Sequence, residues 1–242
     1  MKTIIIIPSR MASSRFPNKP MALIDGLPMV QRVWQQAIIS DMGAVVVACC
    51  EKEVFDLIKS LGGEATMTSP QLPSGTDRIF EVIKNHPEGS QFDSIINLQG
   101  DMPIIDPEDI KKVNIPLIQG FDIGTLVTNL SIEEEKNTDI TKAKISWIKK
   151  NNLGEAKDFY KFSKKQIRNI YHHVGIYSFK YECLKKFVAL HPSLNELYHK
   201  LEQLRALDAK MSIGASFVDN VPLSVDTKED LIKVENIIKA KK

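Results

Sequence analysis

Near its start the chain reads Thr3-Ile4-Ile5-Ile6-Ile7-Pro8-Ser9-Arg10, which is the clearest indication of the fold class. Four β-branched residues in a row, Ile4 to Ile7, predict a strand that is buried on both faces, as in a parallel sheet. A second apolar run, Ala44 to Cys49, predicts another such strand, and apolar residues recur at helical spacing over 28–40 between the two. The order strand, loop, helix, strand predicts a parallel sheet covered by helices.

The same alternation continues along the chain. It predicts helices over 53–61 and 77–85 and strands over 64–68 and 94–98. Further on, we predict strands over 123–130 and 174–179 and helices over 194–207 and 228–238. We therefore expect an α/β fold with a mostly parallel sheet and helices on both faces. A length of 242 residues suits one domain, with an embedded subdomain over about 124–181 where the rhythm is lost.

Basic residues crowd the segment 149–168. They are Lys149, Lys150, Lys157, Lys161, Lys164, Lys165 and Arg168. We expect a solvated loop here, with an anion-facing flap as the alternative.

Overall charge and cysteine content narrow the class of protein. The 32 Lys and Arg residues against 30 Asp and Glu give a net charge of +2, which provides no broad electrostatic reason to expect nucleic acid or membrane as a partner. The three cysteines lack a C-x-x-C spacing, so a zinc ribbon and a disulfide scaffold are excluded. The longest aliphatic run is far too short for a membrane helix. A cytoplasmic protein is expected.

The loop after the first strand, Pro8 to Pro20, carries the strongest chemical signal. It contains the cations Arg10, Arg15 and Lys19 together with the hydroxyl of Ser13. Ligands bind at the carboxyl ends of strands in open parallel sheets, so this loop predicts an anion site, and that number of cations suits a triphosphate. Neither the dinucleotide fingerprint nor the Walker sequence occurs. The alternative is a basic surface loop whose hydroxyls cap turns.

Two carboxylates are candidate metal ligands. Asp101 follows the strand 94–98 and a Gly turn, at the same expected sheet edge, and a carboxylate beside bound phosphates is what Mg²⁺ requires. Thr227 and Asp230 fit a capping box at the start of the last helix. Asp226 is not explained by that cap, and its position supports equally a second metal ligand or a negative charge near a helix N-terminus.

Two further segments contain polar residues of interest. The sequence Ser74-Gly75-Thr76-Asp77 predicts a helix start, which can hold a ligand oxygen. His172 and His173 precede an alternating strand and lack a third histidine at metal spacing, so we expect them to make polar contacts rather than to bind a metal.

Several motifs resemble one enzyme family in the same order along the chain. They are I-P-S-R-M-A-S-S-R-F-P-N-K-P (7–20), S-G-T-D-R (74–78), N-L-Q-G-D-M-P (97–103), H-V-G-I-Y (173–177), K-L-E-Q-L-R (200–205) and S-V-D-T-K-E-D-L (224–231). Together they resemble the 3-deoxy-manno-octulosonate (Kdo) cytidylyltransferases. The resemblance implies a Rossmann-like, GT-A-like nucleotidyltransferase fold, usually dimeric, whose small subdomain serves dimerisation and sugar binding. It also implies Mg²⁺-dependent conversion of CTP and Kdo into CMP-Kdo and pyrophosphate for lipopolysaccharide biosynthesis.

The resemblance also assigns roles by motif. Nucleotide binding falls to Pro8, Arg10, Ser13, Lys19, Ser74, Gly75 and Gln99. Metal binding falls to Asp101 and Asp226, which with Lys19 and Arg15 form the expected catalytic set. Sugar binding falls to Arg15, Lys164, His173, Tyr177, Glu202 and Gln203.

The chain departs from the family pattern at two informative positions. Cys50 stands where the family often has the aspartate of A-T-D, and Lys164 stands where it has the arginine of Y-F-S-R. Lysine lacks the bidentate fork of arginine, so these changes leave room for a related substrate such as 8-amino-Kdo or a nonulosonic acid. A metal-dependent nucleotide-sugar glycosyltransferase and a catalytically inactive binding protein are the remaining alternatives.

Overall fold

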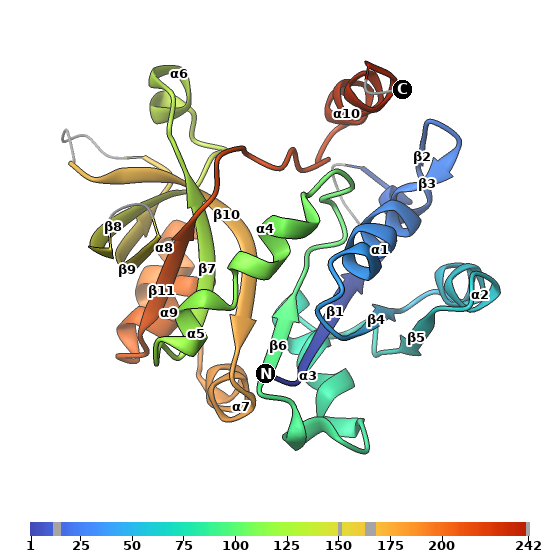
Figure 1. Cartoon of the computed structure of the whole chain (residues 1–242), viewed down its shortest axis with the longest axis horizontal. Helices are drawn as coiled ribbons and strands as arrows, with labels where there is room; N and C mark the ends of the chain where they lie inside the picture. The colour runs from blue at the N-terminus through green and yellow to red at the C-terminus, as the bar shows by residue number, and fades with distance from the viewer. Residues whose placement is uncertain (12–15, 150–151, 163–167, 241–242) are drawn as a thin grey trace. The chain divides into compact units, whose positions relative to one another are not determined.

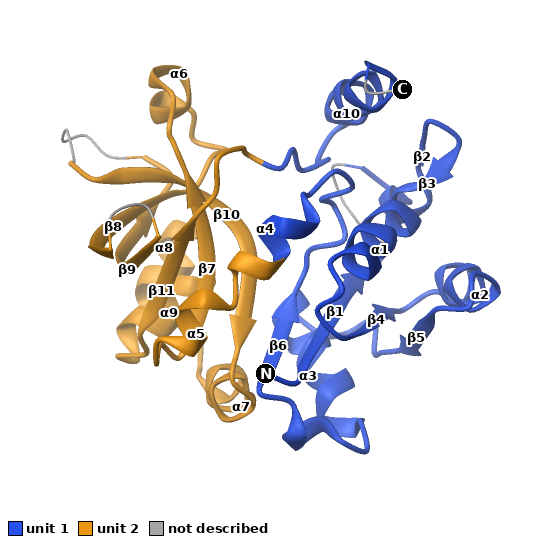
Figure 2. Cartoon of the chain, viewed as in Figure 1, with its two compact units in different colours: residues 1–110, 222–242 blue, residues 111–221 orange. Residues whose placement is uncertain are grey.

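The computed structural model describes residues 1–11, 16–149, 152–162 and 168–240 (Figure 1). They form two compact units, unit 1 with residues 1–110 and 222–242 and unit 2 with residues 111–221 (Figure 2). The inserted unit is longer than the segment 124–181 that the sequence suggests. A single domain with an embedded subdomain stays a prediction.

Unit 1 is built on a parallel sheet with the strand order β5-β4-β1-β6. The strands are β1 (Thr3–Ser9), β4 (Ala44–Cys49), β5 (Glu64–Met67) and β6 (Ser94–Asn97). The side chains of Ile4 to Ile7 are all fully buried, because helices cover this central strand. The predicted α/β fold is confirmed.

The register brings the ends of these strands to one edge of the sheet. Ser9 at the end of β1 pairs with Cys49 at the end of β4, and Ile6 of β1 pairs with Asn97 at the end of β6. Three loops therefore leave the sheet from the same edge, as expected for a ligand site of this fold.

Unit 1 also contains the helices α1 (Met29–Ile39), α2 (Lys52–Ser60), α3 (Gly75–Asn85) and α10 (Lys228–Ala240). A small hairpin of β2 (Leu23–Ile24) and β3 (Leu27–Pro28) precedes α1. Its turn holds Asp25 and Gly26 at φ angles of 46° and 79°, the left-handed conformation that an Asp-Gly pair favours in hairpins. The sequence therefore contained this signal. Two 3-10 turns lie at Lys19–Met21 and Gly89–Gln91.

The last segment of the chain packs on the first loop and helix of unit 1. Val225 and Val234 form a buried cluster with Phe16, Ile24 and Met29. Each fully buried aliphatic side chain contributes roughly 1.5–3 kcal/mol, so this contact is sufficient to fix the start of α10. The predicted amphipathic helix over 228–238 is confirmed.

The described strands of unit 2 lie in the order β10-β7-β11-β9-β8, and β10 also pairs with β8. The strands are β7 (Ile123–Thr128), β8 (Lys142–Lys149), β9 (Leu153–Tyr160), β10 (Ile170–Phe179) and β11 (Ile213–Phe217). Only the pair β7 and β11 is parallel among those whose register is described. The helices are α5 (Ile115–Ile118), α6 (Ile132–Lys136), α7 (Tyr181–Ala189), α8 (Leu194–His199) and α9 (Gln203–Asp208), and α4 (Pro107–Lys112) joins the units in sequence.

The prediction of a solvated loop over 149–168 is wrong for residues 153–160, which form β9. Leu153, Ala156 and Phe159 are buried, and they are spaced closely enough to anchor a strand. Lys157 and Asp158 between them are exposed. These charged residues interrupt the buried positions, so the segment lacks the regular alternation of apolar and polar residues that would predict a strand.

The predicted helix over 194–207 is two helices, because the chain breaks at Lys200, which adopts a left-handed φ of 55°. Arg205 of α9 forms an ion pair with Glu196 of α8, with 2.6 Å between Nη2 and Oε1. Among the described residues, no helix is long and apolar enough to cross a membrane.

Candidate active site

Three predicted nucleotide-binding residues meet where β1 and β6 end. A side chain on Gly75 would lie 3.3 Å from the Pro8 ring and 3.5 Å from the Gln99 amide oxygen. One on Gly100 would lie 2.8 Å from the Pro8 carbonyl oxygen. At Gly100 only glycine permits this close approach to the backbone of Pro8, whereas Gly75 lies against the side chains of Pro8 and Gln99.

The start of α3 is capped as the sequence predicts. Ser74 is the N-cap, and its hydroxyl oxygen accepts a hydrogen bond of 3.1 Å from the Asp77 amide. The Gln99 amide nitrogen donates to the Asn97 side-chain oxygen at 3.0 Å, which restrains the Gln99 side chain beside this helix start. Asn97 is fully buried and was not singled out from the sequence, because its role depends on the fold.

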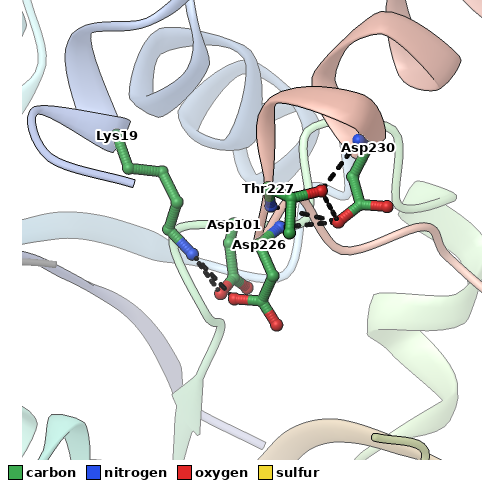
Figure 3. A network of polar contacts seen from close by, with 5 residues as sticks. All are labelled: Lys19, Asp101, Asp226, Thr227 and Asp230. Carbon is green, nitrogen blue, oxygen red and sulfur yellow. Dashed lines mark hydrogen bonds and ion pairs between the residues drawn. The ribbon is translucent and has the colours of Figure 1, made fainter. Parts of the chain in front are cut away.

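Lys19 lies between the two predicted metal carboxylates (Figure 3). Its Nζ is 2.9 Å from Asp101 Oδ2 and 3.3 Å from Asp226 Oδ1. The preceding Asn18 has a left-handed φ of 58°, and its amide donates to the Met11 carbonyl at 3.1 Å. This bond closes the loop and begins the short turn that carries Lys19.

Asp226 is positioned by contacts on both sides. The amide of the buried Val225 donates to the Asp101 carbonyl at 2.9 Å, which places the two aspartates side by side. The Thr227 amide donates to Asp230 Oδ2 at 3.1 Å, and the Asp230 amide donates to the Thr227 hydroxyl at 3.2 Å, which confirms the predicted capping box. Figure 3 shows the Asp226 carboxylate directed to Lys19 rather than into the cap.

The donor set at this point suits a hard divalent cation. Asp101 and Asp226 provide carboxylate oxygens that already converge on one positive charge, the Lys19 ammonium. Mg²⁺ commonly takes one or two carboxylates and completes its shell with water and phosphate oxygens, so two such ligands fit that ion. Among the described residues, no group of three or more His, Cys, Asp or Glu side chains could hold a metal.

Other residues of the first loop are only partly described. Arg10 is exposed at the end of β1. Ser13 and Arg15 lie outside the described residues, as does Lys164. Glu51, which the sequence did not single out, accepts a hydrogen bond of 3.1 Å from the Met11 amide and so restrains the described start of this loop.

Arg78 is a further residue to which the sequence assigns no role. Its side chain is 2% exposed, and its Nη1 lies 2.7 Å from the Cys50 sulfur and 3.2 Å from the Ser69 carbonyl oxygen, with the Thr68 hydroxyl as a further partner. Cys50 stands at the position of the carboxylate that the family pattern predicts, so a thiol here takes the place of an acid beside a buried guanidinium. Burial raises the pKa of Cys50, although the Arg78 charge opposes this effect.

In unit 2, Thr125 holds His173 in place. Its hydroxyl oxygen lies 3.0 Å from His173 Nε2 and 2.9 Å from the Ile176 carbonyl. Because the single hydroxyl proton is donated to the carbonyl, Nε2 of His173 must carry a proton and donate to Thr125. Burial, together with the neighbouring His172, lowers the pKa of His173 to about 3, so the ring is neutral at pH 7.

The described sugar-binding candidates of unit 2 lie on β10 and at the start of α9. The rings of His173 and Tyr177 lie 5.4 Å apart, because an irregularity in β10 between Val174 and Tyr177 returns both residues to neighbouring positions. Burial and the Glu202 carboxylate raise the pKa of Tyr177 well above its usual value. Glu202 and Gln203 begin α9. His172 makes a polar contact as predicted, with its Nδ1 3.0 Å from Glu134 Oε1.

Comparison with known sequences connects this arrangement to one group of enzymes. Residues 4–213 match the family model described as Cytidylyltransferase. The 3-deoxy-manno-octulosonate cytidylyltransferase of Paramagnetospirillum magneticum is 43% identical over 241 residues, which cover 98% of both chains. That of Rhizobium johnstonii is 45% identical over 242 residues, covering 98% of this chain and 96% of the relative.

Solved structures agree with the sequence comparison. CMP:2-keto-3-deoxy-manno-octonic acid synthetase complexed with CTP superimposes with a TM-score of 0.90 at 31% identity, covering all of both chains. UDP-glucose pyrophosphorylase complexed with UDP-glucose gives a TM-score of 0.70 at 13% identity, which indicates a shared fold. The fold is therefore that of nucleotidyltransferases.

Proposed function

The chain belongs to the 3-deoxy-manno-octulosonate cytidylyltransferases, and we propose that it transfers CMP from CTP to the anomeric hydroxyl of Kdo. The products are CMP-Kdo and pyrophosphate, and CMP-Kdo serves lipopolysaccharide biosynthesis. The observation that carries this proposal is the placement of Lys19 between Asp101 and Asp226, beside the edge where β1 and β6 end.

The nucleotide is bound by unit 1. Cytidine lies against Pro8, Gly75 and Gln99, because the two glycines leave backbone accessible at the end of β1 and the start of α3. Ser74 stands at the same helix start, where free amides attract a ligand oxygen. Arg10, Ser13, Arg15 and Lys19 bind the triphosphate, since they gather positive charge and a hydroxyl in one loop.

The chemical step is an in-line substitution at phosphorus. The anomeric oxygen of Kdo forms a bond to the α-phosphorus of CTP, the bond from that phosphorus to the pyrophosphate oxygen breaks, and the hydroxyl proton passes to solvent. Lys19 and Arg15 stabilise the negative charge that gathers on the departing pyrophosphate. Holding both substrates in line provides much of the remaining acceleration.

Asp101 and Asp226 would hold Mg²⁺, for which their paired oxygens are suitable. When bound, this ion would neutralise triphosphate charge and lower the pKa of the attacking hydroxyl.

Unit 2 supplies the residues for the sugar acid. His173 presents a neutral ring held by Thr125, so its Nδ1 can accept a hydrogen bond from a sugar hydroxyl, and Tyr177 stays protonated, so it can donate or accept one. Glu202 and Gln203 at the start of α9 accept from and donate to the same class of group. Arg15 and Lys164, which lie outside the described residues, are assigned to the sugar acid as well, Arg15 to its carboxylate.

We also propose a homodimer in the cytoplasm. The apolar side chains of Leu194, Leu197 and Tyr198 on α8 are 87%, 62% and 83% exposed, and association would cover them. Cys49, Cys50 and Cys183 are free thiols, as expected in a reducing compartment. Analytical ultracentrifugation of the wild-type chain and of Tyr198→Asp tests the dimer, which the variant weakens if α8 forms the contact.

Product analysis tests the reaction itself. With CTP, Kdo and Mg²⁺, phosphorus NMR shows the three CTP signals replaced by one phosphodiester signal and by pyrophosphate. Persistence of the CTP signals, with CTP binding intact, would contradict the proposal.

A further inference from the structure

The carboxylates that suit a divalent cation already share a positive charge supplied by the chain. Lys19 Nζ is within 3.3 Å of an oxygen of each, and the Lys19 side chain is only 15% exposed. The Asp101 and Asp226 side chains are 27% and 41% exposed, so ions from solvent can reach them.

An ammonium in this position affects cation binding in two ways. It attracts the Asp101 and Asp226 oxygens that a divalent cation would use, and it repels that cation at contact distance. With Lys19 present, the group of three carries one negative charge. Without Lys19, the ammonium charge that contacts both carboxylates is removed.

We infer that Lys19 occupies the place of a divalent cation between Asp101 and Asp226 until a nucleotide arrives. The inference rests on the proposed function, because a triphosphate is what provides Lys19 with an alternative partner. Triphosphate oxygens draw the Lys19 ammonium from the carboxylates, and both aspartates then accept a cation. The nucleotide-free protein therefore binds divalent cations weakly, and tight binding of the cation requires CTP.

The shape of the side chain supports this exchange. Lysine is a single movable charge on a flexible stem, whereas arginine is a rigid fork. Lys19 follows the turn at Asn18, whose backbone is held by Met11, so the backbone can stay in place while the side chain changes partner.

The test measures Mn²⁺ alone, added to nucleotide-free protein, by electron paramagnetic resonance and calorimetry. Lys19→Met, which keeps the length of the side chain and removes its charge, binds Mn²⁺ at least tenfold more tightly than the wild type, a change of about 1.4 kcal/mol. Lys19→Arg keeps the charge and stays close to the wild type. Lys52→Met is the matched control, because Lys52 pairs with the exposed Asp56 at 2.6 Å, and it leaves Mn²⁺ affinity unchanged.

Thermal unfolding adds a second readout. In the presence of a chelator Lys19→Met has a lower Tm than the wild type, and Mn²⁺ restores it. Lys19→Gln replaces Lys19→Met if the methionine variant does not fold. Equal or weaker Mn²⁺ affinity in the neutral variants would overturn the inference.

CTP titration of the wild type, run in parallel, separates this inference from the proposed function. If CTP binds and raises Mn²⁺ affinity while the neutral variants bind Mn²⁺ no better than the wild type, only the role of Lys19 is refuted. If CTP binds no better than ATP, GTP or UTP, the proposed function is refuted, whereas the Mn²⁺ result for Lys19 stands.

Discussion

The backbone amide of Val225 donates a hydrogen bond of 2.9 Å to the backbone carbonyl of Asp101. This bond joins the loop after β6 to the segment before α10, and it sets the carboxylates of Asp101 and Asp226 beside one another. A backbone contact thus brings together the loop after β6 and the segment before α10, and the side chains of Lys19, Asp101 and Asp226 meet there.

Asp226→Asn separates catalysis from nucleotide binding. The amide keeps the shape of the side chain and removes the charge, so we expect turnover to fall by about 100-fold or more while CTP affinity stays within about threefold. Steady-state kinetics and calorimetry with CTP measure the two effects. Asp219→Asn, at an exposed aspartate with no assigned role, serves as the control. A rate within about threefold of wild type, roughly 0.7 kcal/mol, would rule out the assigned role.

Gly100→Ala tests the close contact between the ends of β1 and β6. The new methyl group would lie 2.8 Å from the Pro8 carbonyl oxygen, so backbone has to move. We expect a loss of roughly 1–3 kcal/mol in stability together with weaker CTP binding. Gly75→Ala, whose methyl meets side chains rather than backbone, the Pro8 ring at 3.3 Å and the Gln99 amide oxygen at 3.5 Å, costs less stability. Denaturant unfolding of both variants measures the difference, and a milder effect at Gly100 than at Gly75 would contradict the described packing.

Cys50→Asp supplies the carboxylate that the buried Arg78 lacks at this position. A charge-assisted hydrogen bond contributes about 1.5–3 kcal/mol, so the Asp variant is expected to be more stable than Cys50→Asn, which has the same shape without charge. Chemical denaturation at pH 7 compares the two proteins. Equal stability would show that Arg78 gains nothing from an acid partner.

The lowered pKa of the buried His173 makes the stability of the protein depend on pH. Its folded pKa is about 3, while an unfolded histidine has a pKa of about 6.5, so only the unfolded state binds this proton between these values. Stability is therefore unaffected above pH 6.5 and falls as the pH is lowered through that window. Between pH 7 and pH 5 the loss amounts to about 2 kcal/mol.

His173→Gln keeps a polar partner for Thr125 and removes the titration. Its stability is therefore expected to fall less between pH 7 and pH 5 than that of the wild type, in urea unfolding at both values. Parallel losses in the two proteins would assign the acid sensitivity to other groups.

The fold could be predicted wherever burial leaves an unambiguous pattern. Ile4 to Ile7 form a strand covered on both faces, and only apolar residues are accommodated there. The strand β9 was missed because the exposed Lys157 and Asp158 interrupt the buried Leu153 and Phe159, so no regular alternation marks the strand. Lys200 divides the predicted helix over 194–207 through a left-handed backbone, which a lysine rarely adopts and which no local signal announces.

The part of the site that is built from sequence motifs could be predicted. Pro8 lies at the end of β1, Gly75 begins α3, and Gln99 follows β6. Asp101 lies in the same loop as Gln99, and the parallel register of β1 and β6 brings these positions to one edge of the sheet. Thr125 could not be found in this way. Its contact with His173 depends on the irregularity of β10, which the alternation of residues does not encode.

Pyrophosphate release measures the proposed transfer of CMP from CTP to Kdo. The assay contains Mg²⁺ and CTP with Kdo, 8-amino-Kdo or N-acetylneuraminate in parallel, and ATP, GTP and UTP replace CTP as controls. We expect pyrophosphate to be released with CTP and Kdo, and none to be released when another nucleotide replaces CTP. Release with CTP and another acid but not with Kdo would contradict the assigned substrate. If no acid gives pyrophosphate release with CTP, the assignment of this chain as a cytidylyltransferase is contradicted.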